Sequence, residues 1–166
     1  MRILHQDQNF IIREFSAEEH NLFCNLFEDE EVTKYLPYRS PEQYMEMFEI
    51  ALADYLKGPF GRFGIFGAEN NDFIGMCLIR NFADVSGQVE IGYTLSKKYW
   101  GKGIATDVSR ALVVYGFLNT NTDDIVAVTD LDNTGSQKVL EKAGFSRINN
   151  LEREDGELAY YIVTRS

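Results

Sequence analysis

The sequence YWGKGIATD, Tyr99 to Asp107, sets two glycines around a lysine immediately before a segment with helical periodicity. Glycine is favoured where the backbone needs a positive φ or where another molecule approaches the main chain closely. The first N–H groups of a helix lack intrahelical acceptors, and the helix dipole draws anions to the same end. The stretch therefore predicts either a phosphate-binding turn or a strand-to-helix turn whose glycines serve geometry alone. It contains neither of the common glycine-rich nucleotide-binding patterns.

The segments on both sides of this turn alternate between strand and helix patterns. Strands are expected at 10–15, 62–69, 72–82, 88–95, 124–130, 145–150 and 158–165. Helices are expected from Ser16 to Asp29, from Ser40 to Gly58, from Gly103 through Tyr115, and from Asn133 or Thr134 to Ala143. This order predicts a mixed α+β fold, with helices on both faces of a mixed, mostly antiparallel sheet of six to seven strands.

A second motif, DNTGSQKVLEKAGF at 132–145, follows one strand later and places Asn133 and Ser136 at the start of a helix. Together with VEIGYTLSKKYWGKGIATD at 89–107, it resembles the GNAT superfamily of acyl-CoA-dependent N-acetyltransferases. The resemblance is closest to the Rim-type branch, which acetylates the N-termini of ribosomal proteins. FIIREF and DFIGMCLI match the layout of that branch, so the resemblance extends over nearly the whole chain. It implies the GNAT fold and an N-acetyltransferase with acetyl-CoA as co-substrate.

The resemblance also implies which residues bind CoA. The family pattern is Gln or Arg, two residues, Gly, one residue, then Gly or Ala, and Trp100, Gly103 and Ala105 occupy these positions. Trp100 departs from the general pattern but is familiar in the ribosomal branch. Because main-chain N–H groups make the chief phosphate contacts, pyrophosphate binding is expected to survive this departure. The implied pyrophosphate residues are Trp100, Gly101, Lys102, Gly103, Ile104, Ala105 and Thr106.

The pantetheine arm of CoA is expected to lie along the strand before this turn. The resemblance assigns it to the backbone of Tyr93, Thr94 and Leu95, and to the side chain of Asn133. Asn133 also suits an N-cap for the helix that follows it, and the two roles can coexist.

Transfer of an acetyl group to an amine requires a base for the amine proton. Strict alternation in VEIGYTL places Glu90 on the same face as Gly92 and Thr94, with room beside it. Glutamate is disfavoured in strands, so its presence there needs a reason. Glu90 is either the general base, acting through water, or a solvated strand carboxylate. The resemblance to enzymes with a glutamate in this strand favours the base.

Protonation of the thiolate is the second catalytic requirement. Many GNAT enzymes use a tyrosine four residues before the glycine of the terminal Gly-Phe, and this position holds Leu140 here. Leucine cannot donate a proton, so either Ser136 or water is expected to act. Ser136 fits an ordinary first-turn serine equally well.

The amine acceptor is a protein N-terminal α-amine or a small-molecule amine, and the sequence does not decide between them. The regions that correspond to acceptor-binding elements are KYLPYRS at 34–40, Tyr44, Met47, Phe48, Tyr160 and Tyr161, although aromatic residues at such spacing equally fit a core. The acidic run EDEE at 28–31 is either attractive to a cationic acceptor or a solvated face.

Composition limits the class of protein. The chain has 166 residues, of which 45% are hydrophobic, so one domain over 1–166 is expected. The formal net charge of −10 disfavours nucleic acid and favours a cationic partner. No apolar run suggests a membrane span, and no metal site is expected. Cys24 and Cys77 fit core thiols of a reduced, cytoplasmic chain.

Two functions from different classes therefore remain. The first is an active N-acetyltransferase that works by direct attack of the amine in a ternary complex. The second is a catalytically weak or inactive acyl-CoA-binding regulatory module of the same fold. The missing tyrosine at Leu140 favours the module, whereas Glu90 and the intact turn favour the enzyme. The oligomeric state stays open, a homodimer included.

Overall fold

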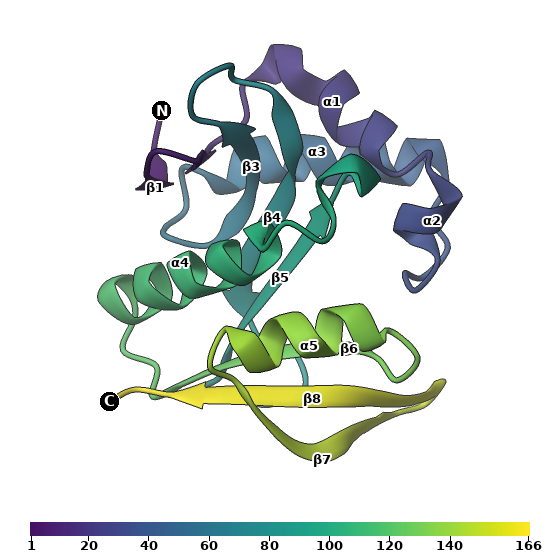
Figure 1. Cartoon of the computed structure of the whole chain (residues 1–166), viewed down its shortest axis with the longest axis vertical. Coiled ribbons are helices and arrows are strands. Elements are labelled where there is room, and N and C mark those ends of the chain that lie inside the picture. Colours follow the sequence, from purple (N-terminus) through teal and green to yellow (C-terminus); the bar gives the residue numbers. More distant parts are fainter.

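The computed structural model describes residues 1–166 and contains one eight-stranded sheet (Figure 1). The strands are β1 (Ile3–Gln6), β2 (Phe10–Arg13), β3 (Gly61–Gly67), β4 (Phe73–Asn81), β5 (Val89–Leu95), β6 (Asp124–Asp130), β7 (Ser146–Arg153) and β8 (Gly156–Thr164). The helices are α1 (His20–Leu26), α2 (Glu30–Thr33), α3 (Pro41–Asp54), α4 (Ile104–Asn119) and α5 (Thr134–Lys142). The mixed α+β class expected from the sequence is confirmed.

The strand order is β1-β2-β3-β4-β5-β6-β8-β7. All neighbouring strands are antiparallel except β5 and β6, which are parallel. The sheet has one strand more than the upper end of the expected range. The additional strand is β1, a short and largely exposed element that pairs irregularly with β2. Four residues without a clear apolar alternation carry too little pattern to predict a strand.

Helices cover both faces of the sheet, as predicted. α4 and α5 cross in front of it in Figure 1, and α3 lies behind it. On the first face, Leu112 of α4 packs in a buried cluster with Ile91 of β5. On the second face, Phe48 of α3 packs in a largely aromatic cluster with Met76 of β4. Complete burial of a leucine, isoleucine, phenylalanine or methionine side chain stabilises the fold by about 1.5–3 kcal/mol each.

Capping residues set the helix starts. The main-chain N–H of Ser40 donates to Gln43 Oε1 at 2.7 Å, and that of Gln43 donates to Ser40 Oγ at 3.2 Å, with Pro41 in the first turn. This start is confirmed. The expected helix from Ser16 to Asp29 is instead divided into a 3₁₀ turn at Ala17–Glu19, α1 and the separate helix α2. Asp29 ends no helix but caps α2, because its carboxylate accepts the N–H of Glu31 at 2.9 Å.

The parallel pair β5 and β6 separates soon after it forms. Only Val89 with Ile125 and Glu90 with Val126 are paired. β5 continues alongside β4 to Leu95, and β6 continues alongside β8 to Asp130. The sheet therefore opens in its middle from Ile91 onward, and the edge of β5 that faces β6 has no strand partner there.

Candidate functional site

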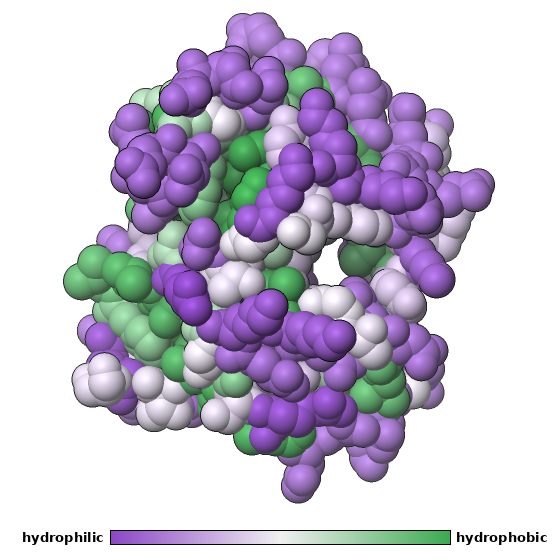
Figure 2. All heavy atoms as spheres, viewed as in Figure 1, coloured by the Kyte–Doolittle hydropathy of each residue, from purple (hydrophilic) through white to green (hydrophobic).

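A cavity of about 580 Å³ occupies the opening between β5 and β6. Figure 2 shows an opening in the surface between the part of the molecule that carries α2 and the part that carries α5. The residues considered from the sequence for CoA binding and catalysis that line this cavity are Glu90, Tyr93, Thr94, Asn133, Ser136 and Leu140. Residues that lie up to 50 positions apart in the chain are thus brought to one cleft.

The glycine turn follows directly after β5 and leads into α4. Gly101 and Gly103 have φ values of 73° and 80°, in the left-handed region that favours glycine. A Cβ built on either residue would meet nothing within 4 Å, so the space in front of the turn is open. The glycines here provide both the dihedrals and an uncovered backbone.

The backbone N–H groups of this turn have no acceptor within the protein. The first helical hydrogen bond of α4 runs from the N–H of Asp107 to the carbonyl of Gly103 at 3.2 Å. The N–H groups of residues 101 to 106 make no hydrogen bond to the backbone or to side chains. Six neighbouring donors at a helix N-terminus, with Lys98 and Lys102 beside the ring of Tyr99, form a concentrated site for an anion.

Trp100 has a structural task in this turn. Its indole Nε1–H donates to the carbonyl of Leu95 at 2.9 Å, which ties the turn to the end of β5. The indole is 45% exposed. This bond explains how a tryptophan can stand at a position where the general GNAT pattern has Gln or Arg. The Leu95 carbonyl accepts this bond with one of its two lone pairs.

α5 begins at the cleft, where Asn133 and Ser136 lie together. The Asn133 side chain accepts the N–H of Ser136 at 3.1 Å and so caps the helix. Its amide nitrogen donates no hydrogen bond within the protein, so the cap leaves this donor available to a ligand in the cleft. Both roles considered from the sequence are compatible with this arrangement.

The hydroxyl groups of Ser136 and Tyr93 form a pair that sequence reasoning missed. Tyr93 Oη lies 2.9 Å from Ser136 Oγ, and either atom can donate. Burial raises the pKa of the Tyr93 phenol, and the bond to Ser136 only partly offsets this. Leu140 lies one turn after Ser136 on the same face of α5 and is 2% exposed. A phenol thus reaches this part of the cleft from β5, although α5 carries no tyrosine.

Glu90 lies on the opposite face of β5 from Tyr93. It is only 7% exposed, and its Oε1 accepts Arg80 Nε at 2.8 Å across the β4–β5 pair. The solvated carboxylate considered from the sequence is therefore not what the structure contains. Gly92 leaves room beside Glu90, because a Cβ there would make only ordinary contacts with Leu78 at 3.4–3.6 Å.

The proposed acceptor residues divide into core and cleft. Tyr44, Phe48, Tyr160 and Tyr161 are buried packing residues, between 0% and 7% exposed. Met47 and the segment 34–39 line the cleft, except for Tyr38. Within the acidic run, Glu31 pairs with Lys97 and Asp29 caps α2, whereas Glu28 and Glu30 form no ion pair. Cys77 is buried and Cys24 half-buried, and burial raises the pKa of both thiols.

Arg62, Arg80 and Arg153 are cleft residues that the sequence did not reveal, whereas Arg39 lies in the segment 34–40 considered for the acceptor. Arg39, Arg62, Arg80 and Arg153 all line the cavity. They come from four different segments, so no short motif contains them. The only sequence signal was that β3 and β4 each carry an arginine, Arg62 and Arg80, within a strand. That these two side chains share the face of Glu90 becomes clear only once the strand register is known.

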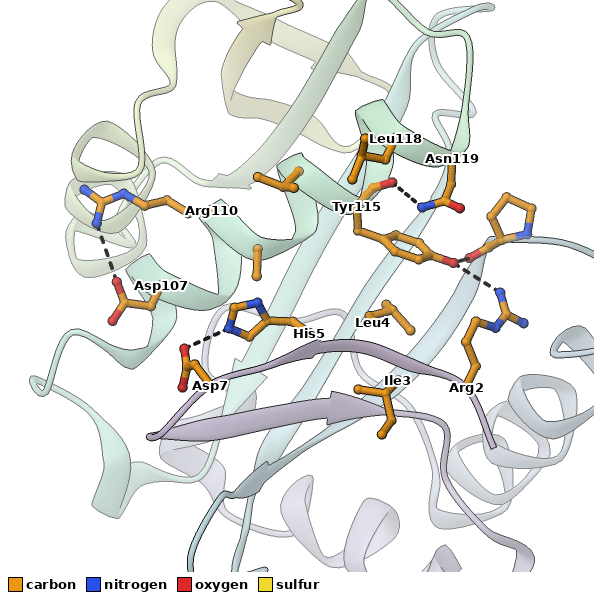
Figure 3. A pocket seen from close by; sticks show the side chains of 13 residues that line it. Arg2, Ile3, Leu4, His5, Asp7, Asp107, Arg110, Tyr115, Leu118 and Asn119 are labelled. Atoms are coloured by element: carbon orange, nitrogen blue, oxygen red, sulfur yellow. Dashed lines mark hydrogen bonds and ion pairs between the residues drawn. The ribbon is translucent and has the colours of Figure 1, made fainter.

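A second and larger hollow, of about 1010 Å³, lies between β1 and α4 (Figure 3). Its polar side chains are paired with each other: His5 with Asp7 at 2.8 Å, and Arg2 Nη1 with Tyr115 Oη at 3.1 Å. It contains none of the predicted site residues. We therefore take the cleft between β5 and β6 as the candidate site.

The structure contains no group of three or more His, Cys, Asp or Glu side chains arranged to hold a metal ion. None of its helices has the length and hydropathy required to cross a membrane.

Comparison with known proteins identifies a family for this chain. The acetyltransferase (GNAT) domain family matches residues 9–146. The chain is 31% identical over 157 residues to the uncharacterized N-acetyltransferase p20 of Bacillus licheniformis. The aligned region covers 91% of this chain and 88% of that protein.

Solved structures share the fold. RimL, a ribosomal L7/L12 α-N-protein acetyltransferase in complex with coenzyme A, superimposes with a TM-score of 0.83 at 15% identity and covers 98% of both chains. The aminoglycoside acetyltransferase AAC(6')-Ib, in complex with coenzyme A and kanamycin, gives a TM-score of 0.78 at 18% identity, with 94% of this chain and 95% of that chain covered. At these identities the likeness concerns the fold.

Proposed function

The chain belongs to the acetyltransferase (GNAT) domain family, and we propose that it transfers an acetyl group from acetyl-CoA to a primary amine, a protein N-terminal α-amine or a small-molecule amine. The amine attacks directly, in a ternary complex. The observation that carries this proposal is the continuity of the site: the uncovered N–H groups of residues 101–106 lead along the free edge of β5 to Glu90.

The residues present fit the shape and charge of CoA. The N–H groups of the turn suit its pyrophosphate, because a helix N-terminus provides donors and a favourable dipole together. The main chain of Tyr93 and Leu95, whose polar groups point to the unpaired edge of β5, suits the amides of the pantetheine arm, which can add to it as a strand does, whereas the main chain of Thr94 faces β4. The amide nitrogen of Asn133 offers a further donor.

Glu90 is the proposed general base. When bound, acetyl-CoA supplies a thioester, whose acetyl carbon forms the new C–N bond and whose C–S bond breaks. Glu90 takes the proton from the amine nitrogen, directly or through a water molecule. The ion pair with Arg80 engages Oε1, and none of the protein's hydrogen bonds uses Oε2, which leaves an oxygen for this proton.

Ser136 and Tyr93 are the proposed route for the second proton. Ser136 Oγ gives its proton to the departing sulfur and regains one from Tyr93 Oη at 2.9 Å, and solvent then reprotonates the phenol. The raised pKa of Tyr93 keeps this phenol protonated at neutral pH. Base and acid thus act from opposite faces of β5, on two sides of the same opening.

Acetyl-CoA consumption by the purified protein tests the proposal. The acceptors are a panel of N-terminal peptides, polyamines and amino acids, and hydrolysis without an acceptor is the background. We expect consumption that depends on an acceptor. A protein that binds CoA but acetylates no amine in the panel would contradict the proposal.

The second candidate function is a regulatory module that binds acyl-CoA without turnover. The observation that favours it is the apolar Leu140, buried where many relatives have a tyrosine. The same consumption assay separates the two functions, because the module predicts a thermal shift with CoA and no acceptor-dependent turnover.

A further inference from the structure

The face of the cleft that carries Glu90 also carries a group of arginines. Arg80 stands directly opposite Glu90 in the β4–β5 register. Arg62 stands opposite Leu78, which in turn stands opposite Gly92. Because opposite residues share a face of the sheet, Arg62 and Arg80 point to the same side as Glu90. Arg39 lines this cavity from the segment before α3.

The charges around this cavity are unequally compensated. Arg80 is paired with Glu90, and Arg153 forms two hydrogen bonds with Asp84 at 2.8 and 2.9 Å. Arg39 and Arg62 have no ion pair, and their guanidinium groups donate no hydrogen bond within the protein. Lys34, the fifth lining cation, lies over the ring of Tyr35.

The remaining acidic groups do not neutralise these arginines. Asp155, in the exposed turn between β7 and β8, and Glu157, near the start of β8, line the cavity. The carboxylate of Asp130, on β6, accepts the N–H of Asp132 at 2.8 Å. These three carboxylates lie in β6, β8 and the β7–β8 turn, on the other side of the opening. On the arginine side, the charges of Asp54 and Glu90 act on Arg62, but Asp54 is paired with Lys57 and Glu90 with Arg80, so Arg39 and Arg62 retain an excess of positive charge.

Arg62 is held in this environment at an energetic cost. It is half-buried, and burial, together with the positive charges of Arg80 and Arg39, lowers the pKa of its guanidinium. A partly desolvated cation without a partner is unfavourable in a folded protein. A bound anion removes this cost, and the planar fork of arginine suits a carboxylate.

The phosphates of CoA do not account for these arginines. The uncovered N–H groups of 101–106 follow the end of β5, on the side of α4. Arg62 and Arg80 lie instead on the face packed by α1 and α3, at the level of Gly92 and Glu90. This is the side from which an amine would approach Glu90.

We propose that the amine acceptor carries a carboxylate, which Arg62 and Arg39 bind while the amine faces Glu90. This inference rests on the proposed function. It replaces the expectation of a cationic acceptor that followed from the net charge of −10, because the local charge of the cleft is opposite to that of the whole chain. The carboxylate can belong to an amino acid or to an acidic residue near a peptide N-terminus.

Matched acceptor pairs test the proposal. One pair is an amino acid and its α-amide, with rates expressed per unprotonated amine; the other is a peptide with Asp or Asn in second position. We expect kcat/KM to favour the carboxylate member of at least one pair by about tenfold or more, the value of a charge-assisted hydrogen bond. The pair that responds identifies the source of the carboxylate.

Variants assign the effect to the arginines. Arg62→Gln is expected to abolish the preference, mainly by raising KM for the carboxylate acceptors, and to leave the thermal shift with CoA unchanged. Lys57→Gln removes the same unit charge outside the cleft and should keep the preference, since Lys57 is 73% exposed. Arg39→Gln, in a loop, repeats the test should Arg62→Gln lose the fold.

A binding experiment distinguishes failure of this inference from failure of the proposed function. The CoA-bound protein is titrated with an N-acetyl amino acid and its amide, and the melting temperature is recorded. If no amine is acetylated but the N-acetyl amino acid stabilises the wild type and not Arg62→Gln, the anion site stands and the proposed function fails. If acceptors are acetylated, and neither charge nor Arg62→Gln alters the ratio within a pair, the inference is overturned while the function stands.

Discussion

The region after the end of β5 and the region around Glu90 offer different kinds of chemical group to a ligand. At the end of β5 the proposed binding groups are main-chain N–H donors in the segment 101–106, whereas around Glu90 they are side chains contributed by separate strands. The first region is contiguous in sequence and has a glycine pattern. The second exists only because the register of β3, β4 and β5 aligns Arg62, Arg80 and Glu90. The proposed cofactor site can therefore be predicted from one short motif, whereas the proposed acceptor site depends on the register of three strands.

The largest effect is expected in the region after the end of β5. Gly103→Glu should abolish the rise in melting temperature with CoA, because the variant forces φ = 80° on a side chain and puts a carboxylate where phosphate binds. Gly87→Glu is the matched control: Gly87 also has a positive φ, of 87°, and open space, but lies in the β4–β5 loop. A full CoA shift in Gly103→Glu would mean that the turn is only structural.

The next effect tests the region around Glu90. Glu90→Gln should lower kcat by roughly 10²-fold or more at neutral pH and keep the CoA shift, because general-base assistance has this size. The loss should shrink as pH rises, since the amine then becomes neutral without help. Glu152→Gln, on exposed β7, is the control. An unchanged kcat at neutral pH would remove Glu90 from the mechanism.

A smaller effect is expected for the hydroxyl pair. Ser136→Ala and Tyr93→Phe should each lower kcat by about tenfold and leave CoA affinity nearly unchanged, since thiols with a pKa near 8–9 leave tolerably well unassisted. The double variant should lose little more than either single one, because both belong to one proton path. Tyr161→Phe removes a hydroxyl bonded to Glu141 instead and should keep kcat. Wild-type turnover in both single variants would make water the acid.

The smallest effect on chemistry is expected for Asn133→Ala. It should weaken CoA binding and leave kcat nearly unchanged, since an interaction made in both ground and transition states affects binding first. Loss of the cap should also lower the free energy of unfolding by about 1 kcal/mol. Calorimetric titration and thermal unfolding measure the two effects. A loss of stability with unaltered CoA affinity would limit Asn133 to its capping role.

Much of the fold could be predicted from the sequence because the residues that start its helices can be recognised from short local patterns. Gly103 before α4, Ser40 with Gln43, and Asn133 before α5 each mark a helix start within a few residues. The short β1 lacks such a signal, and the division of the first helical region depends on the capping preference of Asp29.

The candidate site could be predicted only in part, because only some of its residues belong to short local patterns. Glu90, Ser136 and the turn lie within continuous motifs; Glu90 and Ser136 line one cavity, and the turn follows the end of β5, outside the lining of that cavity. The contact of Tyr93 with Ser136 joins residues 43 positions apart, and it requires the separation of β5 from β6. Leu140→Tyr, attractive from the sequence as a way to restore a phenol, would overpack a side chain that is only 2% exposed.

The most direct measurement is the fate of an isotope-labelled acetyl group supplied as acetyl-CoA, followed by mass spectrometry of acceptor and protein. The account predicts label on the acceptor amine with the wild-type protein, little with Glu90→Gln, and none on the protein itself, because the amine attacks directly. CoA binding without label on any amine, or label retained on a protein side chain as an intermediate, would contradict it.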